Sequence, residues 1–193
     1  MCKLKSAIIL KNKIFMPDYD SHTDMLRELG IKDDYLGASK KFVRAELFPN
    51  DGDVFSDIDN WRFKVDQDIV PDWFDENKYI PLMREKVKEW AKTHIHIGVD
   101  DLIIDSGSNH FVKDCKNVKV YGNATVNEVC GNATVNEVCG NATVIGSKYT
   151  KWNNHNKIIL CDNATFKDCY TKTIYQSGDW KLVNVQNKGG AGE

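Results

Sequence analysis

Residues 122–144 contain an exact nine-residue repeat. The unit Gly-Asn-Ala-Thr-Val-Asn-Glu-Val-Cys occurs twice without a substitution, and a third copy begins as Gly-Asn-Ala-Thr-Val. Short repeats of this kind fold as stacked units, because one unit alone cannot bury its apolar side chains. The repeat therefore constrains the architecture of this half of the chain more strongly than any other feature.

The spacing of apolar residues within each unit indicates strands. In the first copy the apolar positions are Ala124, Val126 and Val129. Residues two apart share one face of a strand, whereas a helix would place them on different faces. Gly, Asn, Thr and Val are also poor helix formers. Each unit therefore predicts a short strand, followed by a corner at Cys-Gly-Asn where glycine tolerates a positive φ.

Two units make 18 residues, which suits one coil of a β-solenoid. Residues 18 apart should then stack on adjacent parallel strands. Stacked asparagines would form a hydrogen-bonded ladder along the solenoid axis. The expected stacked pairs are Ala124 with Ala142, Val126 with Val144, and Asn123 with Asn141.

The repeat pattern returns at residues 160–166 after an interruption. Asn163 lies 22 residues beyond Asn141, which is one coil plus four extra residues. We expect the extra residues to bulge out as a loop within the polar stretch 151–157. That loop is a candidate contact surface, with Trp152 and His155 as candidate partner-binding residues.

The first hundred residues show mixed periodicities and no repeat. They predict a hairpin over residues 7–16, a short helix after Ser21, and strands over residues 42–48 and 61–65. The clearest helix is expected over residues 80–93, and five of its residues should be buried: Leu82, Met83, Val87, Trp90 and Ala91. The predicted organisation is an α+β domain over residues 1–101, a β-solenoid domain over residues 102–186 and a disordered tail over residues 187–193.

Residues 51–76 carry the strongest charge imbalance, with nine acidic residues against two basic ones, a balance of −7. One interpretation is a surface that docks on a basic partner. The other is a set of turn formers and helix caps, positions that aspartate favours. Under the first interpretation, the candidate partner-binding residues of this segment are Asp57, Asp59, Asp66, Asp68, Asp72, Trp73 and Phe74.

Two residue pairs are of ligand type, but neither has a third ligand at a recognisable spacing. Asp66 and Asp68 could hold a divalent cation, and His94 and His96 could begin a zinc site. The sequence also lacks a Gly-x-Ser-x-Gly motif, a phosphate loop and a dinucleotide fingerprint. We therefore expect no catalytic residues, no metal and no cofactor. An enzyme that uses Asp66, Asp68 or His22 stays as an alternative.

The composition favours a soluble protein of the cytoplasm. The longest apolar run, residues 7–10, is too short to span a bilayer, and the start lacks a signal peptide. We expect the six cysteines to be free thiols that serve packing. Residues 103–193 carry ten Lys and Arg against eight Asp and Glu, so no basic stripe predicts direct nucleic-acid binding. No membrane binding is expected.

Several motifs, taken together with the repeat, give the chain a resemblance over nearly its whole length. They are Ser21-His22-x-x-Met25-Leu26-x-x-Leu29-Gly30-Ile31-x-Asp33-Asp34, Phe42-Val43-Arg44-x-Glu46-Leu47, Val65-Asp66-Gln67-Asp68-x-x-Pro71-Asp72-Trp73-Phe74 and Val87-Lys88-Glu89-Trp90. The chain resembles uncharacterised proteins of gut Firmicutes and their prophages. That family has no assigned activity, so the resemblance implies no catalytic residues. Its phage association implies a small accessory protein that interferes with a host defence system.

These observations together predict a non-enzymatic protein-binding module. Its most specific form is a phage-encoded inhibitor of a bacterial defence protein, acting through the acidic and aromatic segment on a partner with a basic surface. A structural role is the alternative, in which solenoid coils stack into filaments or form a homodimer through the C-terminal solenoid.

Overall fold

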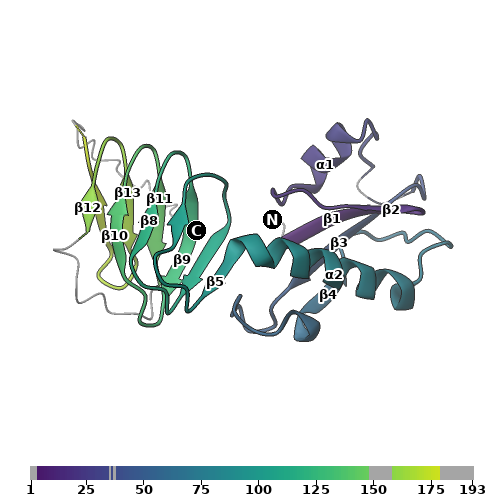
Figure 1. The fold of residues 1–193 in the computed structure, drawn as a ribbon. Helices are drawn as coiled ribbons and strands as arrows, with labels where there is room; N and C mark the ends of the chain where they lie inside the picture. Colours follow the sequence, from purple (N-terminus) through teal and green to yellow (C-terminus); the bar gives the residue numbers. More distant parts are fainter. Residues whose placement is uncertain (1–3, 35, 37, 148–157, 179–193) are drawn as a thin grey trace, which may run out of the picture.

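The computed structural model describes residues 4–34, 36, 38–147 and 158–178. Its strands form one four-stranded antiparallel sheet near the N-terminus and two mostly parallel sheets that belong to a β-solenoid. A long helix leads from the first sheet into the solenoid (Figure 1). The solenoid prediction is confirmed, with about three turns over residues 95–146.

The N-terminal sheet has the strand order β2-β1-β3-β4. Its strands are β1 (Lys5–Leu10), β2 (Lys13–Phe15), β3 (Val43–Phe48) and β4 (Arg62–Val65). The predicted hairpin is confirmed, since Leu10 pairs with Lys13 across a two-residue turn. The strands predicted over residues 42–48 and 61–65 are confirmed as β3 and β4.

Both α-helices begin at side-chain caps. The helix α1 (His22–Glu28) starts after Ser21, whose side chain accepts a hydrogen bond from the Asp24 amide at 3.3 Å. The helix α2 (Glu76–His94) starts after Asp75, whose carboxylate accepts from the Asn77 amide at 3.0 Å. Because Asp75 caps the helix, α2 begins four residues before the predicted start at residue 80.

The buried face of α2 corrects one prediction. Met83, Val87 and Trp90 are buried against the N-terminal sheet, as predicted, and Ala91 is partly buried there. Leu82 is 49% exposed, so its predicted burial is wrong. The buried stripe repeats every three or four residues through Met83, and the residue just before Met83 is turned about 100° away from it.

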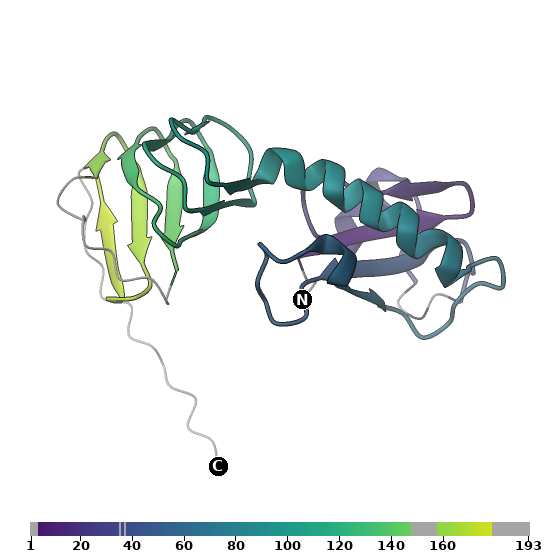
Figure 2. The same ribbon diagram turned by 60° about the horizontal axis from the view of Figure 1, so that its bottom comes forward.

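The solenoid consists of two sheets that face each other. One contains β5 (Ile95–Ile97), β7 (His110–Lys113), β9 (Thr125–Cys130), β11 (Thr143–Gly146), β13 (Thr165–Asp168) and the antiparallel strand β14 (Thr173–Gln176). The other contains β6 (Ile103–Ile104), β8 (Val118–Val120), β10 (Val135–Val138) and β12 (Ile159–Leu160). Each nonapeptide supplies one strand, and successive nonapeptides belong to opposite sheets (Figure 2).

Strand register confirms the predicted stacking within the repeat. Val126 pairs with Val144, an offset of 18 residues. Val144 pairs in turn with Phe166, an offset of 22, so the interruption adds four residues without changing which positions stack. The first coil is shorter, because Ile95 pairs with Phe111 at an offset of 16. Solenoid pairing thus begins at Ile95, where α2 ends.

The predicted asparagine ladder is confirmed. The Asn141 amide donates to Asn123 Oδ1 at 3.1 Å, and the Asn163 amide donates to Asn141 Oδ1 at the same distance. The inward side chains between the sheets form one continuous apolar core, which includes Val126, Val144 and Phe166. The ladder and the core therefore continue past the interruption.

The solenoid corners explain where the repeat uses glycine. Gly131 and Gly140 have φ values of 64° and 74°. In the coils at either end of the exact repeat, the stacked corner residue is an aspartate with φ of 55°, namely Asp114 or Asp162. Asp114 Oδ1 accepts from the Asn132 amide at 2.7 Å, and Asp162 Oδ2 accepts from the Gly140 amide at 3.0 Å. Each aspartate thus caps backbone donors of the neighbouring glycine corner.

The N-terminal sheet and the solenoid share packed side chains. Phe111 of β7 is 7% exposed and belongs to the apolar cluster that α2 and the N-terminal sheet form. The Asn109 amide donates to the Asp18 carbonyl at 3.0 Å, and Lys113 Nζ lies 5.3 Å from the Phe55 ring centre. The loop expected within residues 151–157, the strand expected over residues 180–185 and the tail lie outside the described residues.

Two glycine substitutions separate backbone strain from close stacking. An added Cβ at Gly140 would lie 2.7 Å from the Gly122 carbonyl oxygen, whereas one at Gly98, φ 64°, would meet nothing within 4 Å. We expect Gly98→Ala to lower the free energy of unfolding by about 1–2 kcal/mol through strain. Gly140→Ala should cost about 1–3 kcal/mol more through overpacking. Denaturant titrations measure both values, and equal losses would contradict the stacked corner.

Candidate functional site

Several carboxylates of residues 51–76 serve the local backbone. Asp51 Oδ1 accepts from the Asp53 amide at 2.9 Å, and Asp53 Oδ1 accepts from the Phe55 amide at 3.0 Å. Asp57 caps the short 3-10 helix η1 (Ile58–Asn60), as Asp75 caps α2. These four aspartates have the turn and capping roles that aspartate favours.

Other candidate partner-binding carboxylates are paired with lysines. Asp59 lies 2.8 Å from Lys88 Nζ, and Asp72 lies 3.4 Å from Lys40 Nζ. Asp66 lies 2.6 Å from Lys64 Nζ, and that hydrogen bond is the main cause that lowers the pKa of Asp66. These exposed pairs reduce the local negative charge at a small energetic gain.

Trp73 and Phe74 are half-buried rather than fully exposed. The Phe74 ring stacks on Phe63 and Tyr79, with ring centres 6.4 and 5.3 Å away. The Trp73 indole donates to the Lys40 carbonyl at 3.0 Å. Both aromatic residues therefore stabilise the margin of the N-terminal core, and each keeps part of its surface in contact with solvent.

Exposed apolar side chains lie beside this acidic segment. Leu36, Ile69 and Val70 are 55%, 38% and 39% exposed. The Ile69 amide donates to the Leu36 carbonyl at 2.9 Å, which joins two chain segments. With Asp68 and Asp72 they form what we call the acidic–apolar patch: Leu36, Asp68, Ile69, Val70 and Asp72.

The sequence analysis did not identify the apolar members of the patch. Its signal is the pair Ile69-Val70, which lies among turn residues between Asp68 and Pro71 and outside any strand. The patch precedes α2, at the helix end remote from the solenoid (Figure 1). Trp152 and His155, the other candidate partner-binding residues, lie outside the described residues.

An acidic cleft separates the N-terminal sheet region from the solenoid. It has a volume of about 530 Å³, and its lining includes Asp51 and Asp53 on one side and Glu128, Ile145 and Cys169 on the other. Three carboxylates in one cleft favour a cationic side chain over an anionic one.

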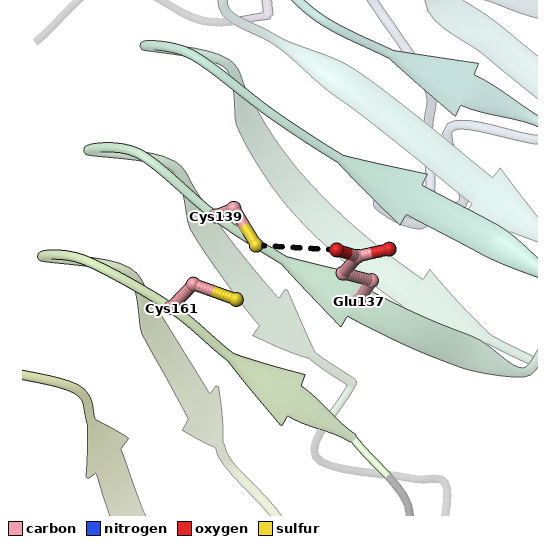
Figure 3. Close-up of side chains that lie close together, drawn as sticks. All are labelled: Glu137, Cys139 and Cys161. Atoms are coloured by element: carbon pink, nitrogen blue, oxygen red, sulfur yellow. Dashed lines mark hydrogen bonds between the residues drawn. The ribbon is translucent and has the colours of Figure 1, made fainter.

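One ligand-type cluster gathers residues that the enzyme alternative invoked. Among the described residues, His22, Glu46 and Asp66 bring their ligand atoms within 4.8 Å of one another. His22 Nδ1 is 3.7 Å from Asp66, and Lys64 Nζ lies 4.0 Å from Glu46. Burial lowers the pKa of His22. Because Lys64 already binds both carboxylates, the geometry favours an internal ionic network; Asp68 does not belong to this cluster. A second cluster, Glu137, Cys139 and Cys161, lies on the solenoid (Figure 3).

The predicted pair His94 and His96 meets through a third histidine. The His110 ring stacks on His94 with ring centres 5.0 Å apart and on His96 with centres 5.6 Å apart. Trp90 extends the stack on the far side of His94, at 4.7 Å. His110 could have been found from the first-coil offset of 16, which places it beside His94. The stack lies where α2 joins the solenoid.

Neither a protein-family model, nor a curated protein sequence, nor a solved structure shows a match to this chain. The function is therefore inferred from the chain's own side chains. Within the described residues, no helix combines the length and the apolar character that a bilayer-spanning helix requires.

The histidine stack predicts a pH-dependent stability. Burial lowers the pKa of His96 from 6.5 to about 4, and burial also lowers the pKa of His110. Between these pH values the unfolded chain binds more protons than the folded chain, so the free energy of unfolding should fall as the pH is lowered from about 7 to about 5. His96→Gln should make that fall smaller. Denaturant titrations at both pH values test this, and an unchanged pH dependence in the variant would contradict it.

Proposed function

We propose that this chain is a non-enzymatic protein-binding module whose acidic–apolar patch takes up a basic and partly apolar surface of another protein. The observation that carries the proposal is the exposure of Leu36, Ile69 and Val70 beside Asp68 and Asp72. Adjoining apolar residues with a polar rim are typical of protein interaction sites. The patch belongs to the N-terminal α+β domain, which the solenoid extends as a rigid scaffold.

Charge supports a basic partner. The Asp72 side chain is 91% exposed although it pairs with Lys40, and Asp68 is exposed as well. Lys40 is itself half-exposed, so a partner's arginine or lysine can reach the same carboxylate. A surface of this kind accelerates association with a basic partner, and the effect weakens as salt increases. Ile69 and Val70 would supply the buried centre of the interface.

The most specific form of this proposal is a phage-encoded inhibitor of a bacterial defence protein, acting in the bacterial cytoplasm. Its support is the resemblance of residues 21–34, 42–47, 65–74 and 87–90, with the repeat, to prophage-associated proteins. In this form the module needs no cofactor and binds neither nucleic acid nor membrane directly. Occupation of a basic surface would block whatever acidic ligand that surface normally binds.

Charge reversal in the patch tests the proposal. Affinity capture from bacterial lysate, followed by mass spectrometry, would identify a basic partner retained by the native chain. The double variant Asp68→Lys/Asp72→Lys should lower that partner's affinity by at least about tenfold, because two attractive charges become repulsive. Ile69→Ser/Val70→Ser should weaken binding while leaving its salt dependence unchanged.

A matched control changes the net charge equally at a remote place. Asp100 and Asp105 are exposed and follow α2 at the solenoid end. Asp100→Lys/Asp105→Lys should leave partner affinity within about twofold, since screening removes the influence of distant surface charges. Equal affinity of the patch variant and the native chain would reject the patch as the binding surface.

Self-association is a second candidate function. Ile159 of β12 and Ile174 of β14 are 59% and 63% exposed at the C-terminal coil, and Tyr170 nearby is 48% exposed. Apolar side chains at the end of a solenoid can pair with a second copy. Light scattering over a concentration series separates the two functions, because a monodisperse monomer excludes filaments and dimers.

A further inference from the structure

The outer face of the second solenoid sheet aligns two cysteines and a glutamate. Val138 is fully buried between Glu137 and Cys139, so these two side chains project from the outer face of β10. Val138 pairs with Leu160, and the Cys161 amide donates to the Val138 carbonyl at 3.0 Å. Cys161 therefore lies beside Cys139 on the next coil, and Figure 3 shows the three side chains on the same face.

The ligand atoms are close to the spacing that one metal ion requires. Cys139 Sγ lies 3.5 Å from Glu137 Oε1, and the three ligand atoms all lie within 4.8 Å of one another. Ligand atoms of a tetrahedral zinc site lie roughly 3.4–3.8 Å apart, given metal–sulfur bonds of about 2.3 Å and metal–oxygen bonds of about 2.1 Å. Small side-chain rotations on a half-buried surface can close the remaining difference.

Neighbouring groups hold the glutamate in a suitable orientation. The Tyr121 hydroxyl donates to Glu137 Oε2 at 2.8 Å, and Lys119 Nζ lies 3.4 Å from the same oxygen. The hydrogen bond from Tyr121 is the main cause that lowers the pKa of Glu137, so the carboxylate is charged. Oε1 is the oxygen turned toward Cys139. Partners that fix the far oxygen of a metal-binding carboxylate are typical of protein metal sites.

We propose that Cys139, Cys161 and Glu137 bind a thiophilic divalent cation such as zinc, with water as the fourth ligand. Binding forms two metal–sulfur bonds and one metal–oxygen bond, and two thiol protons leave to solvent. Two thiolates and a carboxylate then carry three negative charges, which the dication and the Lys119 ammonium balance. No electron is transferred. The ion would join β10 to β12 and so fasten the coil that follows the interruption.

Proton release makes the binding pH-dependent. Burial raises the pKa of Cys139 to about 12, and the adjacent Cys161 and Glu137 raise it further. Both thiols are therefore protonated at neutral pH without metal, and the cation must displace their protons. The affinity should increase as the pH rises, until Lys119 begins to lose its charge.

The repeat itself supplies a matched control. Glu128 and Cys130 occupy the same positions of the preceding nonapeptide, on the other sheet. Cys130 pairs with Lys113 on one side, and Ser147, whose amide bonds the Val129 carbonyl at 2.9 Å, lies on the other. Cys130 thus has the same local sequence as Cys139 but no neighbouring thiol in these two registers, so it should not bind the cation.

Cobalt(II) titration of the full-length, reduced protein tests the site. Thiolate coordination gives a sulfur-to-cobalt charge-transfer band, which should saturate at one equivalent and disappear when zinc is added. Cys139→Ser and Cys161→Ser should each lose the band, and Glu137→Gln should weaken binding by at least about tenfold. Cys130→Ser and Glu128→Gln should match the native protein.

A second measurement does not depend on any variant. The native protein should release about two protons for each cobalt ion bound, as a pH indicator reports. Absence of the band, its persistence in Cys139→Ser, or its loss in Cys130→Ser would overturn the proposal. Formation of a Cys139–Cys161 disulfide in place of metal binding, shown by mass spectrometry before reduction together with no cobalt band after it, would overturn it as well.

Discussion

The stacking register between adjacent coils is the constraint on which the rest of the structure depends. In a parallel solenoid each residue contacts the residue one coil away more closely than most of its sequence neighbours. An offset of 18 residues places valine on valine and asparagine on asparagine. The same register puts the Asp114 carboxylate against the Gly131 corner and puts Cys161 beside Cys139. The core, the corners and the proposed metal site are therefore consequences of one offset.

Much of the fold could be predicted because its signals are local or periodic. The exact repeat specifies the strands, the coil length and the asparagine ladder, since identical units must stack in an equivalent way. The caps of α1 and the hairpin between β1 and β2 are likewise set within a few residues of Ser21 and Lys11. The interruption was predictable as a change of offset from 18 to 22, and β13 confirms that change.

The side-chain meetings could not be predicted, because they depend on distances through space. The lysines that pair with the acidic segment come from as far as Lys40 and Lys88. His110 joins His94 only because the first coil has an offset of 16 rather than 18. Leu82 is exposed because helix rotation, rather than apolar character, selects the residues of α2 that face the sheet. Pairing of Cys139 with Cys161 required knowing which sheet each nonapeptide joins.

Disulfide cross-linking of equivalent threonines measures the register most directly. Thr125, Thr134 and Thr143 hold the same position in three successive units, and Thr125 pairs with Thr143. In a chain whose native cysteines are replaced, Thr125→Cys/Thr143→Cys should cross-link rapidly with diamide, because adjacent parallel strands lie about 4.8 Å apart, within disulfide reach. Thr125→Cys/Thr134→Cys should not, because these residues belong to opposite sheets. Efficient cross-linking of the second pair in place of the first would show a nine-residue coil and contradict the stacked arrangement.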